Sequence, residues 1–260
     1  MKAFVGFSSG QDAVLALYKT LTETDYDVYA INVQHRKIYA KNDIKYHEQY
    51  RNSIIDWLRE NCRDFVYDSI VGPVAYWSPH WQGDKDYSEV SAEKVNEWKN
   101  KYKTEYWISV LEQWYAYTKV AQKLECDTII AGNDIVQIRN ITGTSGVELV
   151  NIISEIDVSF PLRSLGRIGI YHLLPEELKE RIAPCDDFKS MRTSGPCGRC
   201  RKCLTRRIYD NLYMTEKYTI EELDKIYYIY SILFIIFYII FGIYFFMLNI
   251  NSINIIICFG

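Results

Sequence analysis

Short apolar runs alternate with helical patterns along the chain, and this alternation limits the possible folds most strongly. Residues 4–7 and 28–33 have the length and apolar character of buried strands. Between them, Val14, Leu17 and Leu21 recur at the spacing of one helix face. Strands that are separated by helices run parallel, because each connection crosses over the sheet. The sequence therefore predicts an α/β fold, a doubly wound parallel sheet with helices on both faces.

The same alternation continues further along the chain. Apolar spacing at residues 54–58 predicts a helix, and an extended segment begins at Phe65. A second strong helical pattern covers residues 107–124 and leads into a short apolar strand at residues 128–132. In such folds ligands bind beyond the carboxyl ends of the strands. We therefore expect the site at the loops that follow Phe7, Val33 and Gly132.

The first of these loops has the composition of a phosphate-binding turn. Ser8, Ser9 and Gly10 lie between the first strand and the first helix, where backbone N–H groups and the helix dipole attract anions. Asp12, in the first turn of that helix, is placed to hold Mg²⁺ against a pyrophosphate. A plain helix N-cap would have the same composition. No Gly-Lys-Ser/Thr follows, so the loop is not a Walker P-loop.

Four of the seven cysteines cluster near the end of the charged part of the chain. Cys197, Cys200 and Cys203 are spaced three residues apart around Gly198, and Cys185 lies 12 residues upstream. Four thiolates can complete the tetrahedral coordination of a structural Zn²⁺. A disulfide framework would be expected with a secretory signal, which the N-terminus lacks. A redox pair with Cys185 uninvolved is the other alternative.

Charge is distributed unevenly along the 260 residues. The net charge of −3 excludes a generally polycationic nucleic-acid binder. No charged residue follows Lys225, and the 23 uncharged residues 226–248 are long enough to cross a bilayer of roughly 30 Å. We expect a cytoplasmic protein with either a C-terminal membrane anchor or an unselected extension resembling translated AT-rich DNA.

Loop and cysteine cluster together resemble one enzyme family. Residues 7–12 (FSSGQD) resemble the Ser-Gly-Gly-x-Asp-Ser loop of N-type ATP pyrophosphatases, the PP-loop superfamily. Residues 196–203 (PCGRCRKC) followed by Arg206 resemble the zinc knuckle of the 7-cyano-7-deazaguanine synthase (QueC) family. Phe160-Pro161-Leu162 and a helix at residues 175–181 match that family's spacing. The resemblance covers about residues 2–207.

The resemblance implies a Rossmann-like PP-loop ATPase fold with a C-terminal zinc knuckle. It also implies an ATP-dependent ligase that converts 7-carboxy-7-deazaguanine and ammonia to the nitrile through an acyl-adenylate, in queuosine or 7-deazaguanine biosynthesis. Family members tend to dimerise. Ser8 and Asp12 would be catalytic, Zn²⁺ would be held by Cys185, Cys197, Cys200 and Cys203, and Mg²⁺ would accompany ATP. The ATP-binding residues would be Phe7, Ser8, Ser9, Gly10, Gln11, Asp12, Ala13, Val14, Leu15, Ala16 and Leu17.

The sequence departs from the family at three places. Ser9 replaces the first loop glycine, and Ala13 replaces the final loop serine. After Gly132 the family has an Asp-Tyr-rich stretch ending in Asp-Cys-Arg, whereas this chain keeps only Asp134 and Arg139 as candidate substrate-binding residues. The spacer between Cys185 and Cys197 is also longer than is usual in the family.

Two other functions therefore compete with the synthase. One is a divergent relative that acts on another carboxylate or base in a defence or nucleic-acid modification system. The other is a non-enzymatic, zinc-stabilised binding module.

The expected domains are a PP-loop domain at residues 1–165, a helical zinc-binding subdomain at 166–225 and the tail at 226–260. Cys62 and Cys126 are expected to be buried small residues, and the isolated histidines His35, His47, His80 and His172 to be surface or core residues.

Overall fold

The structure is a computed structural model. Its described residues are 1–34, 41–71, 108–132, 156–185, 191, 195–198, 200–212, 218–230, 232–233 and 236.

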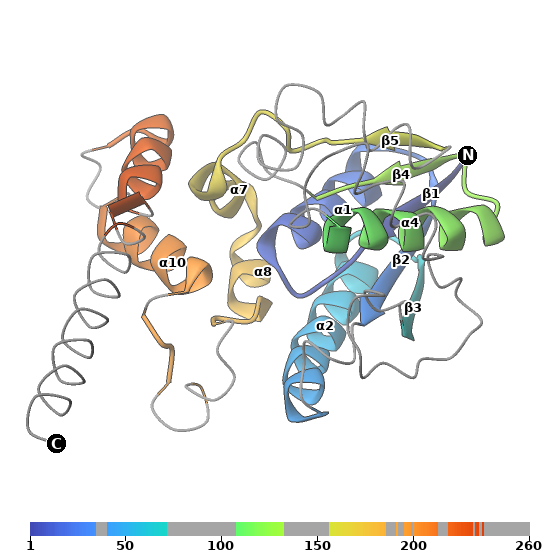
Figure 1. Cartoon of the computed structure of the whole chain (residues 1–260), viewed down its shortest axis with the longest axis horizontal. Helices are drawn as coiled ribbons and strands as arrows, with labels where there is room; N and C mark the ends of the chain where they lie inside the picture. The colour runs from blue at the N-terminus through green and yellow to red at the C-terminus, as the bar shows by residue number, and fades with distance from the viewer. Residues whose placement is uncertain are drawn as a thin grey trace, which may run out of the picture.

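A five-stranded sheet forms the centre of the protein (Figure 1). All four pairings between its strands are parallel, in the order β3-β2-β1-β4-β5. The strands are β1 (Lys2–Gly6), β2 (Asp27–Gln34), β3 (Val66–Val71), β4 (Thr128–Ile130) and β5 (Asp157–Ser159). The predicted parallel α/β fold is confirmed.

Helices connect and cover the strands. They are α1 (Gln11–Glu23), α2 (Lys41–Asn61), α4 (Ile108–Lys123), α7 (Arg167–Leu173), α8 (Glu176–Arg181) and α10 (Arg201–Leu212). Residues 220–230 are also helical. The helices predicted after the first and second strands, before β4 and at residues 175–181 are all present, and α8 has Pro175 at its N-cap.

The two faces of the sheet bury separate hydrophobic clusters. Ala3 and Val5 of β1 pack with side chains from α1, α2, α7 and α8, whereas Phe4 packs with α4 on the other face. Alternate residues of one strand thus enter opposite cores, as the pleat requires. The sheet is therefore doubly wound, as the sequence predicted.

The C-terminal helices extend the first of these cores. Figure 1 shows α7 and α8 beside the sheet, with α10 and the helix of residues 220–230 on their far side. Ile208 and Tyr209 of α10 and Leu223 of the last helix belong to the same buried cluster as Val14 of α1. The last helix is thus packed against the main core as far as Tyr227. Beyond it, the large apolar residues that the structure describes are exposed, namely Tyr228, Ile229, Tyr230, Ile232, Leu233 and Ile236.

Candidate functional site

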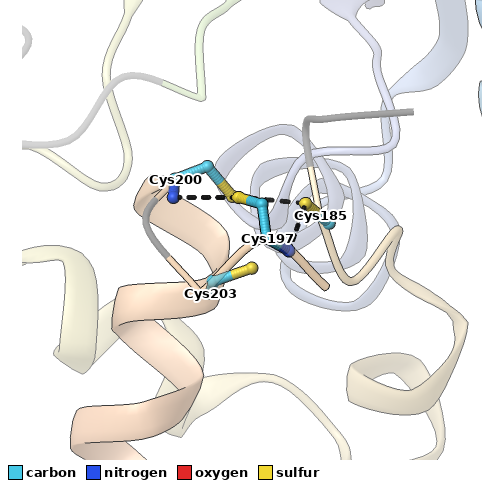
Figure 2. Close-up of side chains that lie close together, drawn as sticks. All are labelled: Cys185, Cys197, Cys200 and Cys203. Carbon is cyan, nitrogen blue, oxygen red and sulfur yellow. Dashed lines mark hydrogen bonds between the residues drawn. The ribbon is translucent and has the colours of Figure 1, made fainter. Parts of the chain in front are cut away.

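The four clustered cysteines converge in space. The sulfur atoms of Cys185, Cys197, Cys200 and Cys203 all lie within 4.8 Å of one another, and those of Cys185 and Cys200 are 3.7 Å apart. Figure 2 shows the four side chains gathered around one point, with Cys203 coming from the first turn of α10. Cys185 and Cys203 are buried, and the other two are half-buried. The sequence-predicted group is therefore assembled.

A tight turn brings the three downstream cysteines together. Gly195 and Gly198 have φ values of 84° and 71°, a backbone conformation that glycine adopts without steric cost. The Cys200 amide donates a hydrogen bond to the sulfur of Cys197 over 3.3 Å, and the Cys197 amide donates to the sulfur of Cys185 over 3.4 Å. Donors of this kind stabilise negative charge on a thiolate.

The spacing of the sulfurs fits a single metal ion. At a Zn–S bond of about 2.3 Å, the edges of a four-sulfur tetrahedron are about 3.8 Å long. In a four-iron cluster each thiolate binds a different iron, so its sulfurs lie further apart. Burial raises the pKa of the Cys203 thiol, and the hydrogen bond with the Cys200 side chain raises this pKa further. The thiolate form that binds a metal would therefore depend on a bound cation to stabilise it.

Arg206 joins the cysteine cluster to the rest of the protein. Its Nη2 donates hydrogen bonds of 2.8 Å and 3.0 Å to the backbone carbonyls of Lys179 and Ile182, at the end of α8. These carbonyls have no partner inside their helix, so a cationic donor satisfies them well. Arg206, which sequence analysis noted only as part of the zinc-knuckle resemblance, thus fastens α10 to α8.

The Ser/Gly loop lies at the carboxyl end of the central strand. The Phe7 amide donates to the Ile31 carbonyl over 2.9 Å, and the Asn32 side chain donates to the Phe7 carbonyl over 2.8 Å. The Ser8 hydroxyl oxygen accepts a 3.2 Å hydrogen bond from the Gly10 amide. The N-cap residue Gly10 supplies no side-chain cap to α1. The turn therefore joins the central strand to α1 at the edge of the sheet where α/β proteins commonly bind ligands.

Gly132 holds β4 against this turn. A Cβ at Gly132 would lie 2.6 Å from the Asp12 carbonyl oxygen and 2.9 Å from the Ala13 Cα. The end of β4 therefore packs directly on the first turn of α1. The chain leaves β1 towards β2 on one side while β4 pairs on the other, which is the topological switch point at which open α/β sheets bind ligands.

Arg167 is a partner of the loop that sequence analysis missed. Its Nη1 lies 2.9 Å and 3.1 Å from the two carboxylate oxygens of Asp12, and both side chains are largely buried. The Gln11 side chain donates to the Arg167 backbone carbonyl over 2.8 Å. The first turn of α7 thus fixes the first turn of α1. The expected Mg²⁺ role of Asp12 stays a prediction.

His47 is the second missed partner. Sequence analysis took it for an isolated surface or core histidine, but its Nδ1 lies 3.0 Å from the Ser9 hydroxyl. Ser9 itself is only 3% exposed, so its side chain faces α2. No spacing motif could have indicated this contact, because it joins residues 38 positions apart.

The remaining predicted residues divide into three groups. The side chains of Val14, Leu15, Ala16 and Leu17 are buried in the core, so their role in the structure is packing. Asp134 and Arg139, with His35 and His80, lie outside the described residues. Cys126 is buried as expected, whereas Cys62, just beyond the end of α2, is half-buried.

Similarity to known proteins is found among solved structures. No family model and no curated protein matches the sequence. Among solved structures, U34-tRNA thiolase NcsA from Methanococcus maripaludis with its 4Fe-4S cluster is similar, with 14% identity and a TM-score of 0.38, over 87% of this chain and 71% of that one. A predicted subunit of a tRNA methyltransferase from Methanocaldococcus jannaschii has 17% identity and a TM-score of 0.36, over 66% of this chain and 73% of that one. Neither likeness bears on function at these scores.

The apolar tail was expected to be either a membrane anchor or an unselected extension. Within the part of the chain that the structure describes, no helix has both the length and the apolar character needed to cross a bilayer. Of the segment 226–248 expected as an anchor, only residues 226–230, 232–233 and 236 are described.

Proposed function

We propose that this protein is an ATP-dependent enzyme of the PP-loop type, which activates a carboxylate by transferring AMP to it. The observation that carries the proposal is the position of the Ser8–Asp12 turn. It caps the central strand at the switch point of the sheet, and Gly132 packs on its backbone. Strand order, loop composition and an uncapped helix N-terminus together support a site for the nucleotide phosphates.

The proposed substrate is 7-carboxy-7-deazaguanine, as in the synthases that the sequence resembles. Its carboxylate oxygen attacks the α-phosphorus of ATP, the bond to the β-phosphate oxygen breaks, and pyrophosphate leaves. Ammonia then displaces AMP from the acyl-adenylate and gives the amide. The amide oxygen then attacks the α-phosphorus of a second ATP, which releases a second pyrophosphate, and loss of AMP and of the two amide protons gives the nitrile.

This chain's own groups would act on the leaving pyrophosphate. Backbone N–H groups at the start of α1 and the Ser8 hydroxyl would stabilise the negative charge that develops on it. Ser8 is exposed, so its hydroxyl is accessible to a ligand. Mg²⁺ bound with ATP would neutralise part of the phosphate charge, and Asp12 is its candidate ligand in this loop.

The cysteine group would hold a structural Zn²⁺. Its four sulfurs come from two separate segments, residue 185 and residues 197–203. A bound ion would supply a cross-link between them, with no coordination position left for substrate. The cross-link would hold α10 next to α8, where Arg206 already bonds.

A divergent relative with another substrate is the second candidate. Ser9 stands where the family loop has glycine, and its hydroxyl contacts His47 of α2. Because the serine side chain and the histidine next to it are absent from the family's glycine loop, the phosphate site would differ from that of the family. The acceptor in that case would be another carboxylate or base.

Pyrophosphate release tests the proposal. The full chain would be incubated with ATP, Mg²⁺, ammonium and 7-carboxy-7-deazaguanine, and pyrophosphate would be measured with and without the acceptor. We expect acceptor-dependent release that falls by about tenfold or more in Ser8→Ala. Thr22→Ala removes an exposed hydroxyl at the far end of α1 and is the matched control. No release from folded protein with any carboxylate acceptor would refute an adenylating enzyme, and release only with a different carboxylate would favour the second candidate.

A further inference from the structure

Arg51 of α2 is a buried cation whose donors are not all satisfied. Arg51 is only 5% exposed, and its Nε and Nη2 atoms are buried without a hydrogen-bond partner. A guanidinium remains charged at any physiological pH. Buried charges in proteins are normally paired, because desolvation of an unpaired one is costly. Among the described residues, Arg51 therefore has no anionic partner that would offset the cost of burying its charge.

The position of Arg51 on α2 indicates where that anion binds. His47 lies four residues earlier, so the two side chains share one face of the helix. Further along the same face, Ile55 and Leu58 are buried in the core. Long side chains on a helix lean towards its N-terminus, which directs Arg51 to the turn that carries His47. His47 in turn contacts Ser9, at the phosphate loop.

Charge near the loop favours an anion. The Asp12 carboxylate, which would otherwise repel phosphate, is paired with Arg167. The acidic residues Glu48 and Asp56 of α2 are exposed to solvent, whereas Arg51 is buried. The N-terminus of α1 contributes a further partial positive charge. No carboxylate among the described residues forms an ion pair with Arg51.

We propose that Arg51 forms, with the Ser9 loop that His47 contacts, an oxyanion subsite that binds the distal phosphates of a nucleoside triphosphate. This rests on the proposed function, because that function supplies the nucleotide. Arg51 binds the anion through charge-assisted hydrogen bonds. His47 is a positioning residue that fixes Ser9 and the loop beside it. The buried, unsatisfied guanidinium is the feature that a bound pyrophosphate group completes.

Inorganic pyrophosphate is the probe for this subsite. Calorimetric titration of the full chain should show binding, with affinity about ten- to hundredfold weaker in Arg51→Gln, the loss expected for a hydrogen bond to a charged group. Arg59→Gln is the matched control, because Arg59 lies on the same helix but is exposed. Unchanged affinity in Arg51→Gln would overturn the proposal, as would the absence of pyrophosphate binding to the wild-type chain. Titration with inorganic phosphate separates a single-phosphate site from one for two linked phosphates: a preference for phosphate would also overturn it.

Thermal stability gives a second readout with an opposite sign. Arg51→Met removes the unsatisfied charge, so it should raise the melting temperature without ligand and abolish the increase that saturating pyrophosphate gives. A purely structural arginine would behave in the reverse way, with a lower melting temperature and an unchanged increase. If Arg51→Met does not fold, Arg51→Lys decides, since it keeps the charge but loses the planar fork. An affinity drop of about threefold or more in that variant supports the subsite, and none refutes it.

Failure of the subsite is distinguishable from failure of the proposed function. Arg51-dependent pyrophosphate binding without acceptor-dependent release from ATP would leave the subsite intact and refute the adenylating enzyme. Acceptor-dependent release that is unchanged in Arg51→Gln would leave the enzyme intact and refute the subsite.

Discussion

Gly132 gives the sharpest test of how the phosphate loop is held. Its replacement by alanine places a Cβ 2.6 Å from the Asp12 carbonyl oxygen and 2.8 Å from the Asp12 carbonyl carbon. Carbon–oxygen contacts in proteins are ordinarily about 3.3 Å or longer, so β4 and α1 would have to separate by roughly 0.7 Å. The obstructing atoms are backbone, which cannot rotate away as a flexible side chain can.

The expected cost follows from that displacement. Overpacking of a filled core typically costs about 1–3 kcal/mol. For a chain of this size each kcal/mol lowers the melting temperature by about 2–4 °C. Gly132→Ala should therefore unfold at a visibly lower urea concentration and bind pyrophosphate more weakly, because the first turn of α1 moves.

Gly169→Ala is the control for this substitution. Gly169 lies within α7, and the nearest atom to its added Cβ is 3.4 Å away, an ordinary contact. Alanine also favours a helix over glycine, so this variant should be as stable as the wild type or about 0.5–1 kcal/mol more stable. Equal urea midpoints for Gly132→Ala and the wild type, with unchanged pyrophosphate affinity, would refute the contact between β4 and the loop.

Three further predictions concern the C-terminal part. Cys200→Ser should lower the zinc content of purified protein below one equivalent by elemental analysis, whereas Cys62→Ser, outside the cluster, should not; equal zinc in both would refute the metal centre. Arg206→Ala should lower the free energy of unfolding in urea by about 1.5–3 kcal/mol, because two carbonyls of α8 lose a charged donor, and exposed Arg207→Ala should change it little. Burial, then a nearby lysine, lowers the pKa of His172, so the unfolded chain binds that proton more readily. Stability should thus decrease as pH falls below about 6.5, and His172→Gln should reduce this slope of urea midpoint against pH, an unaltered slope being contrary evidence.

Local patterns predicted the parts of the site that are local in sequence. The Ser/Gly turn follows from a strand, a glycine and a helix within about twenty residues, and each leaves its own periodic signal. Cys197, Cys200 and Cys203 lie within one turn and the start of a helix, so their convergence could be read from spacing. Both predictions are confirmed by the structure.

The partners of the loop could not be predicted in this way. Arg167 is 155 residues from Asp12, and its sequence surroundings contain no motif that separates it from an ordinary surface arginine. Arg51 lies in a helical pattern that is otherwise explained by packing. What makes these residues informative is burial and pairing, which exist only once α2 and α7 are packed beside α1.

The last described helix has a consequence for how the protein can be shortened. Asp224 accepts hydrogen bonds of 2.7 Å and 3.3 Å from the amides of Ile168 and Gly169, the second and third residues of α7. The residue that begins α7, Arg167, pairs with the phosphate loop. The helix that carries Asp224 runs on to residue 230, where its apolar side chains are exposed. The same helix therefore stabilises the start of α7 through Asp224 and also leads into the apolar tail. A truncation before Asp224 would remove these hydrogen bonds together with the tail.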